Sequence, residues 1–99
     1  MTGSIHYDFT ARIWQHSGAG GWHFVSLPQH ISNEIRENHG WQEEGWGRLK
    51  VRAKIGLATW DTAIWFDTRS GSYLLPVKAE IRKKLQPEMG TEMEISIFV

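Results

Sequence analysis

Alternating apolar and polar side chains constrain the fold of this chain more than any other feature. The pattern is clearest in residues 49–55, where apolar residues alternate with a row of basic ones. It recurs in residues 5–15, 57–66 and 93–99. A period of two is typical of strands that bury one face. The sequence therefore predicts a mainly β fold.

Two shorter apolar segments, residues 22–27 and 72–75, are also predicted to be strands, which makes six. Each is followed by a proline and then by apolar residues four apart, a spacing typical of a helix that buries one stripe. Because proline fits the first turn of a helix, we expect two short helices that begin at Pro28 and Pro76. The order strand, proline, helix, strand thus occurs twice. It predicts a barrel-like sheet capped by two helices.

The composition indicates one folded domain over residues 1–99. The chain has 99 residues, of which 40% are hydrophobic and 22% charged, and it has no cysteine. The absence of cysteine excludes disulfides, thiolate zinc sites and a cysteine nucleophile. No apolar run approaches the length of a membrane span, and the start lacks the pattern of a signal peptide. We therefore expect a cytoplasmic protein that does not contact membranes.

Four motifs occur in an order that resembles a known family. They are GGWHFVSLP (20–28), GWGRLKVRAKIG (45–56), TWDTAIWFD (59–67) and YLLPVKAEIRK (73–83). From about Tyr7 to its end, the chain resembles a bacterial family of domains of unknown function, sometimes found beside a YdeI/OmpD-associated domain. The resemblance implies a double-split β-barrel related in architecture to the AbrB/MazE proteins. One departure is Thr91, where the family usually has an aspartate. The family implies no activity.

The sequence offers no catalytic or metal-binding constellation. The five histidines lack the His-x-His and His-Glu-x-x-His spacings of metal sites. No serine lies in a Gly-x-Ser-x-Gly motif. The glycines of residues 18–21 precede a predicted strand instead of a helix, so they do not form a phosphate cradle. We assign no catalytic residue, metal or cofactor. We predict a non-catalytic binding or interaction module.

A first alternative is an AbrB-like role in nucleic-acid binding or regulation. Its candidate residues form a basic row on one predicted strand: Arg48, Lys50, Arg52 and Lys54. Such a row could follow a phosphate backbone. It could equally be a solvated strand face, or pair with acidic residues such as Glu92 and Glu94. The formal net charge of zero favours these simpler interpretations over nucleic-acid binding.

The six tryptophans suggest a second alternative, the binding of a small anionic ligand. We expect Trp22 and Trp60 in the barrel interior. Lys78 and Arg82 are four residues apart on the second predicted helix, and with the two indoles they could bind an anion near the barrel mouth. The simpler interpretation is that both are solvated, or that Arg82 braces a carboxylate.

Some of the remaining tryptophans are candidates for contact with a partner. Trp14 and Trp65 lie on the less apolar faces of their strands, so we expect them at a homodimer contact or at the surface for another partner. Trp41 and Trp46 flank an acidic loop. The sequence identifies no specific partner.

Overall fold

The computed structural model describes residues 5–18, 20–45, 47–85 and 91–99. Its strands are β1 (His6–Ala11), β2 (Trp14–Gln15), β3 (His23–Ser26), β4 (Arg48–Ile55), β5 (Ala58–Asp67), β6 (Ser72–Pro76) and β7 (Met93–Phe98). Its helices are α1 (Gln29–His39) and α2 (Ala79–Leu85), with a short 3-10 helix, η1 (Gly40–Gln42), after α1. The fold is therefore mainly β with two short helices, as predicted.

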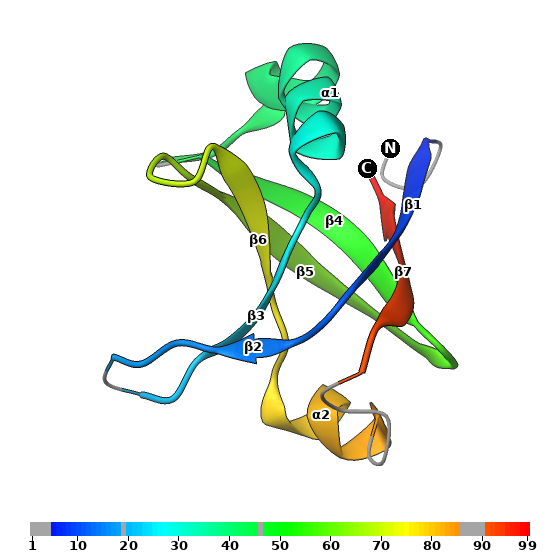
Figure 1. The fold of residues 1–99 in the computed structure, drawn as a ribbon. Coiled ribbons are helices and arrows are strands. Elements are labelled where there is room, and N and C mark those ends of the chain that lie inside the picture. Colours follow the sequence, from blue (N-terminus) through cyan, green and yellow to red (C-terminus); the bar gives the residue numbers. More distant parts are fainter. Residues whose placement is uncertain (1–4, 19, 46, 86–90) are drawn as a thin grey trace.

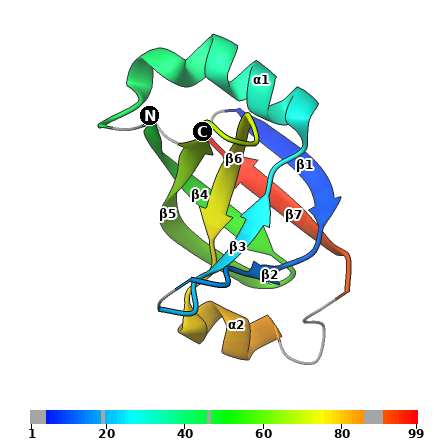
Figure 2. The same ribbon diagram turned by 60° about the vertical axis from the view of Figure 1, so that its left-hand side comes forward.

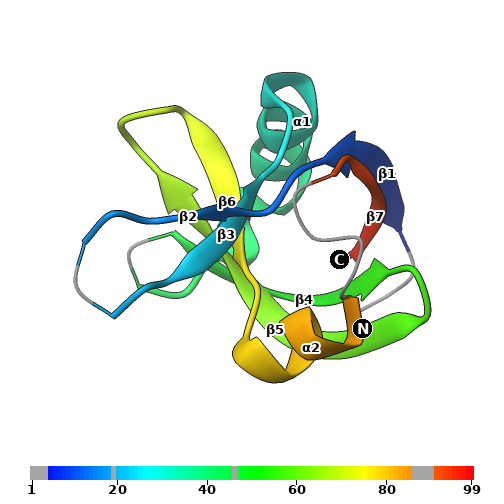
Figure 3. The ribbon, with the colours of Figure 1, turned by 60° about the horizontal axis from the view of Figure 1, so that its bottom comes forward.

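All strands pair antiparallel in one sheet, which curls into a half-barrel in the order β1-β7-β4-β5-β6-β3-β2 (Figure 1). The described residues form seven strands instead of the six expected, because residues 5–15 are interrupted between Ala11 and Trp14. β1 pairs with β7 at one edge of the sheet, and β2 pairs with β3 at the other. At the interruption, the chain passes directly from the β1 edge of the sheet to the β2 edge. This segment lies on the side of the half-barrel opposite β4 and β5 (Figure 3). The double-split arrangement stays a prediction.

The hydrophobic core fills the inside of this curled sheet. Along β4, every second residue is buried, and the basic row points outward. The inward residues of β4 and β7 are largely aliphatic: Leu49, Val51, Ala53, Ile55, Met93, Ile95 and Ile97. The alternation thus predicted which face of β4 and of β7 is buried.

The two helices cover opposite ends of the half-barrel (Figure 2). α1 begins directly after Pro28 and buries Ile31 and Ile35, as the spacing predicted. The prediction that a helix begins at Pro76 is wrong. Pro76 is the last residue of β6, opposite Phe24 of β3, and α2 begins three residues later. Proline, which has no N–H, suits the end of a strand as well as the start of a helix.

Polar contacts hold α1 against β6. The buried backbone N–H of Tyr73 donates to Ser32 Oγ at 3.0 Å, and the Tyr73 hydroxyl donates to the Glu43 carboxylate just after η1. Gln29 Nε2 donates to the Gly71 carbonyl at 2.7 Å. These bonds fix the segment between β3 and β4 over the end of the half-barrel.

No helix within the described ranges is long and apolar enough to cross a membrane.

Candidate functional site

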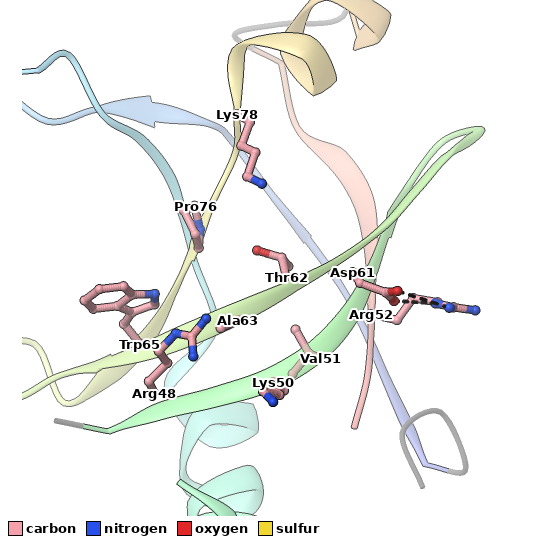
Figure 4. Close-up of a pocket in the computed structure, with 10 residues that line it drawn as sticks. All are labelled: Arg48, Lys50, Val51, Arg52, Asp61, Thr62, Ala63, Trp65, Pro76 and Lys78. Carbon is pink, nitrogen blue, oxygen red and sulfur yellow. Dashed lines mark hydrogen bonds and ion pairs between the residues drawn. The ribbon is translucent and has the colours of Figure 1, made fainter. Parts of the chain in front are cut away.

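A cleft opens where β5 and β6 separate. β5 is ten residues long, yet within the described chain it pairs with β6 only from Trp65 to Asp67. Beyond Leu74, β6 turns away toward α2, and a hollow of about 570 Å³ lies between the strands (Figure 4). Its walls come from β4, β5, β6 and the residues after β6: Arg48, Lys50, Val51, Arg52, Asp61, Thr62, Ala63, Trp65, Pro76 and Lys78. We call this hollow the β5–β6 cleft.

The register of the sheet explains which side chains reach the cleft. Outward residues of β4 lie opposite outward residues of β5, so that Arg48 faces Trp65 and Arg52 faces Asp61. These side chains stand on the outer face of the sheet. Val51 and Thr62 belong to the inner face. Their presence in the lining means that the cleft reaches between the strands toward the core.

One ion pair neutralises the far end of the cleft. Arg52 Nε donates to Asp61 Oδ1 at 2.8 Å, and Arg52 Nη2 lies 3.4 Å from Asp61 Oδ2. The hydrogen bond and the guanidinium charge lower the pKa of Asp61, and the same contacts raise the pKa of Arg52. Both side chains point away from the centre of the cleft (Figure 4). The pair therefore adds no net charge to it.

The other cations of the cleft outnumber the carboxylates that pair with them among the described residues. Arg48 Nη1 lies 3.3 Å from Glu44 Oε1, and Lys50 Nζ lies 3.8 Å from Glu44 Oε2, so two cations share one carboxylate. Lys78 has no ion pair or hydrogen bond from its amine to any described residue. Its amine points into the cleft, on the same side as the Thr62 hydroxyl (Figure 4). Arg48, Lys50 and Lys78 carry three positive charges. Glu44 carries one negative charge, which leaves two positive charges uncompensated at the cleft.

An apolar slot adjoins the cleft. It has a volume of about 290 Å³ and is lined by His16, Trp22, Phe24, Trp65, Leu74 and Pro76. Trp22 and Phe24 are nearly parallel, with 9° between their rings and 6.2 Å between their centroids. Trp65 and Pro76 also line the cleft, so the slot and the cleft share a wall.

The structure brings together three of the four residues predicted for a small anionic ligand. Trp22, Lys78 and Arg82 line a further hollow of about 290 Å³ beside α2, whereas Trp60 does not. Trp60 is partly buried and packs against the core, as expected. The prediction that Trp22 lies in the barrel interior is wrong: Trp22 precedes β3 on the outer surface and is 58% exposed. Arg82 Nη1 donates a hydrogen bond to the Val77 carbonyl oxygen at 2.7 Å, and this carbonyl takes the place of the carboxylate partner considered from the sequence.

The basic row is exposed, as predicted, but its predicted acidic partners are wrong. β7 pairs with β4 only from Ile95 onward, and Glu94 lies opposite Thr10 of β1. Among the described residues, the row instead pairs with Glu44 and with Asp61. Lys54, at the end of the row, lies opposite Thr59 and outside the cleft.

The other tryptophans fall into two groups. Trp14 and Trp65 are exposed, as predicted, at 38% and 48%. Trp41 is also exposed, and its indole N–H donates to the Asn38 carbonyl at the end of α1. Trp46 lies outside the described residues. So do Pro87 and Gly90, whose residue types predict the end of the second helix.

Sequence reasoning missed the cleft and the contributions of Thr62, Pro76 and Glu44 to it. The one signal was Pro76, which cannot donate to a strand ladder and so marks where pairing with a neighbour stops. Within the described part of the chain, no three histidine, aspartate or glutamate residues are placed to hold a metal ion.

Comparison with known families identifies a family that covers most of the chain. The model of a family described as a domain of unknown function, DUF1905, matches residues 9–97. No curated protein matches the chain.

Proposed function

The chain belongs to the DUF1905 family, whose description names no activity, and we propose that it is a non-catalytic binding module for an anionic ligand. The binding site in this proposal is the β5–β6 cleft. The observation that carries it is Lys78, an ammonium group that faces the cleft and has no partner among the described residues.

The surplus of positive charge supports this proposal. Among the described residues, Arg48 and Lys50 share the Glu44 carboxylate and Lys78 has no ion pair, so an incoming anion would meet two uncompensated charges. Two unit charges 4 Å apart attract by about 1 kcal/mol in water and about 4 kcal/mol in the partly screened surroundings of a protein surface. The cleft volume of about 570 Å³ lies within the range of roughly 300–1,000 Å³ typical of ligand sites.

The chemistry of the lining favours binding over catalysis. General acid–base catalysis requires a group whose pKa lies near the working pH. Asp61 is the carboxylate of the cleft wall, and Arg52 lowers its pKa, so it stays ionised and paired. The remaining ionisable groups of the lining are Arg and Lys side chains, which suit charge neutralisation.

Nucleic-acid binding through the basic row is the weaker candidate. A protein that follows a phosphate backbone needs cations spaced along its surface. Asp61 neutralises Arg52 in the middle of the row, so the row does not present an unbroken line of free cations. A contact of Trp14 and Trp65 with a second copy or another protein stays a prediction; sedimentation velocity would test the former.

Isothermal titration calorimetry with sodium pyrophosphate tests the proposal. We expect binding at low ionic strength that weakens as salt is added, because the charges are exposed. Lys78→Ala should weaken the affinity about tenfold, which corresponds to about 1.4 kcal/mol. The matched control is Lys83→Ala on the exposed side of α2, which should leave the affinity unchanged. Absence of binding, or equal losses in both variants, would refute an anion site at the cleft.

A further inference from the structure

We propose that the anionic ligand also carries a flat aromatic ring, which occupies the apolar slot while its anionic group lies in the β5–β6 cleft. The proposal rests on the proposed function, since it takes the cleft as the anion site. The ligand class is a small ring-bearing phosphate or carboxylate, of which a nucleoside monophosphate is a convenient representative.

The first support is that the two hollows adjoin each other. Trp65 and Pro76 line both of them, so one molecule lying across this shared wall would contact both hollows. The cations Arg48, Lys50 and Lys78 lie on the cleft side of this shared wall, and Trp22 and Phe24 lie on the slot side. A ligand that matches both sides has one charged end and one apolar end.

The second support is the shape and exposure of the slot walls. The parallel rings of Trp22 and Phe24 present flat faces, and aromatic rings pack well against such faces. Trp22 is 58% exposed and Trp65 is 48% exposed, although an indole is a large apolar surface. A ring in the slot would cover both indoles. Bases stack favourably on aromatic side chains in nucleic-acid complexes.

The distribution of charge favours a small molecule over a polymer. Arg48, Lys50 and Lys78 line one cleft, and the Arg52–Asp61 pair interrupts the row of cations between this cleft and Lys54. The slot holds about 290 Å³, which is room for one ring system and not for a series of stacked bases.

Three probes distinguish the contribution of the ring to binding from that of the anionic group. Adenosine monophosphate has both, ribose 5-phosphate has only the phosphate, and adenosine has only the ring. We expect adenosine monophosphate to bind at least tenfold more tightly than either of the others. Calorimetry gives the affinities, and circular dichroism confirms that each variant is folded.

Variants on each side of the shared wall should have different effects. Trp22→Leu should reduce the affinity for adenosine monophosphate about tenfold and leave ribose 5-phosphate unchanged, whereas Lys78→Ala should weaken both. Trp65→Leu provides a second test of the slot. The matched control is Trp41→Leu, because Trp41 is 81% exposed and lies at the end of α1, away from the slot.

Each contrary outcome has a distinct meaning. If adenosine monophosphate and ribose 5-phosphate bind equally, the ring proposal is overturned and the anion site stands. If pyrophosphate and both phosphates fail to bind, the anion site itself fails. If a ten-residue deoxyadenosine oligonucleotide binds far more tightly than adenosine monophosphate, with a steeper loss of affinity in salt, the small-molecule assignment is overturned in favour of nucleic acid.

Discussion

Replacing Tyr73 by phenylalanine tests how the segment from α1 to η1 is held on the sheet. Tyr73 is fully buried, and its hydroxyl donates to the Glu43 carboxylate. The substitution removes one oxygen atom and leaves that carboxylate without its donor. A hydrogen bond to a charged group contributes about 1.5–3 kcal/mol. For a domain of this size, a loss of 2 kcal/mol lowers the melting temperature by roughly 10 °C.

Because of the contact between Tyr73 and Glu43, the stability of the fold should fall at alkaline pH. Burial, the hydrogen bond to Glu43 and its negative charge raise the pKa of Tyr73 above its usual value of 10.0. The unfolded chain therefore loses the phenolic proton at a lower pH than the folded one. The contribution to stability is complete below pH 10 and falls as the pH rises further, by up to about 1.4 kcal/mol per pH unit.

Urea unfolding at pH 7 and between pH 9 and pH 11 measures both effects. Tyr73→Phe should be less stable at pH 7 and should lack the part of the alkaline loss that Tyr73 causes. The control is Tyr7→Phe, because Tyr7 is partly buried on β1 and none of the hydrogen bonds identified among the described side chains involves its hydroxyl. An unchanged stability at pH 7, or an unchanged alkaline slope, would show that the bond to Glu43 does not stabilise the fold.

Three further predictions concern the fold and the cleft. Ser32→Ala should cost about 1–3 kcal/mol in urea unfolding, because it leaves a buried backbone N–H unpaired; a neutral result contradicts this. Gly47→Ala should destabilise more than Gly56→Ala. Both have positive φ, but a Cβ at Gly47 would lie 2.9 Å from Phe66 Cβ, whereas one at Gly56 would meet nothing; equal losses would exclude the clash. Asp61→Asn should tighten pyrophosphate binding about twofold, the effect of one charge at about 10 Å in water; weaker binding would argue against the cleft.

The sequence predicted local features well. Alternation identified the buried face of β4, and the four-residue spacing identified Ile31 and Ile35 as the buried stripe of α1. In these segments one face is apolar and the other polar, so the period alone determines the orientation. The exposure of Trp65 followed from the same argument.

Features that depend on contacts between distant strands could not be read from the sequence. Alternation continues through Ala11 and Trp14, although the chain changes its pairing partner there. Residues 22–27 are apolar on both faces, so the exposure of Trp22 had no local signal. The cleft arises because β6 leaves β5 after Leu74, which is a property of the assembled sheet.

Nuclear magnetic resonance during a pyrophosphate titration tests whether the β5–β6 cleft binds an anion. Backbone amide shifts locate the bound anion without assuming which side chain holds it. We expect the largest changes on the two walls of the cleft, at residues 61–63 and 77–78. Changes confined to α1 and η1, or no change at millimolar pyrophosphate, would contradict this expectation.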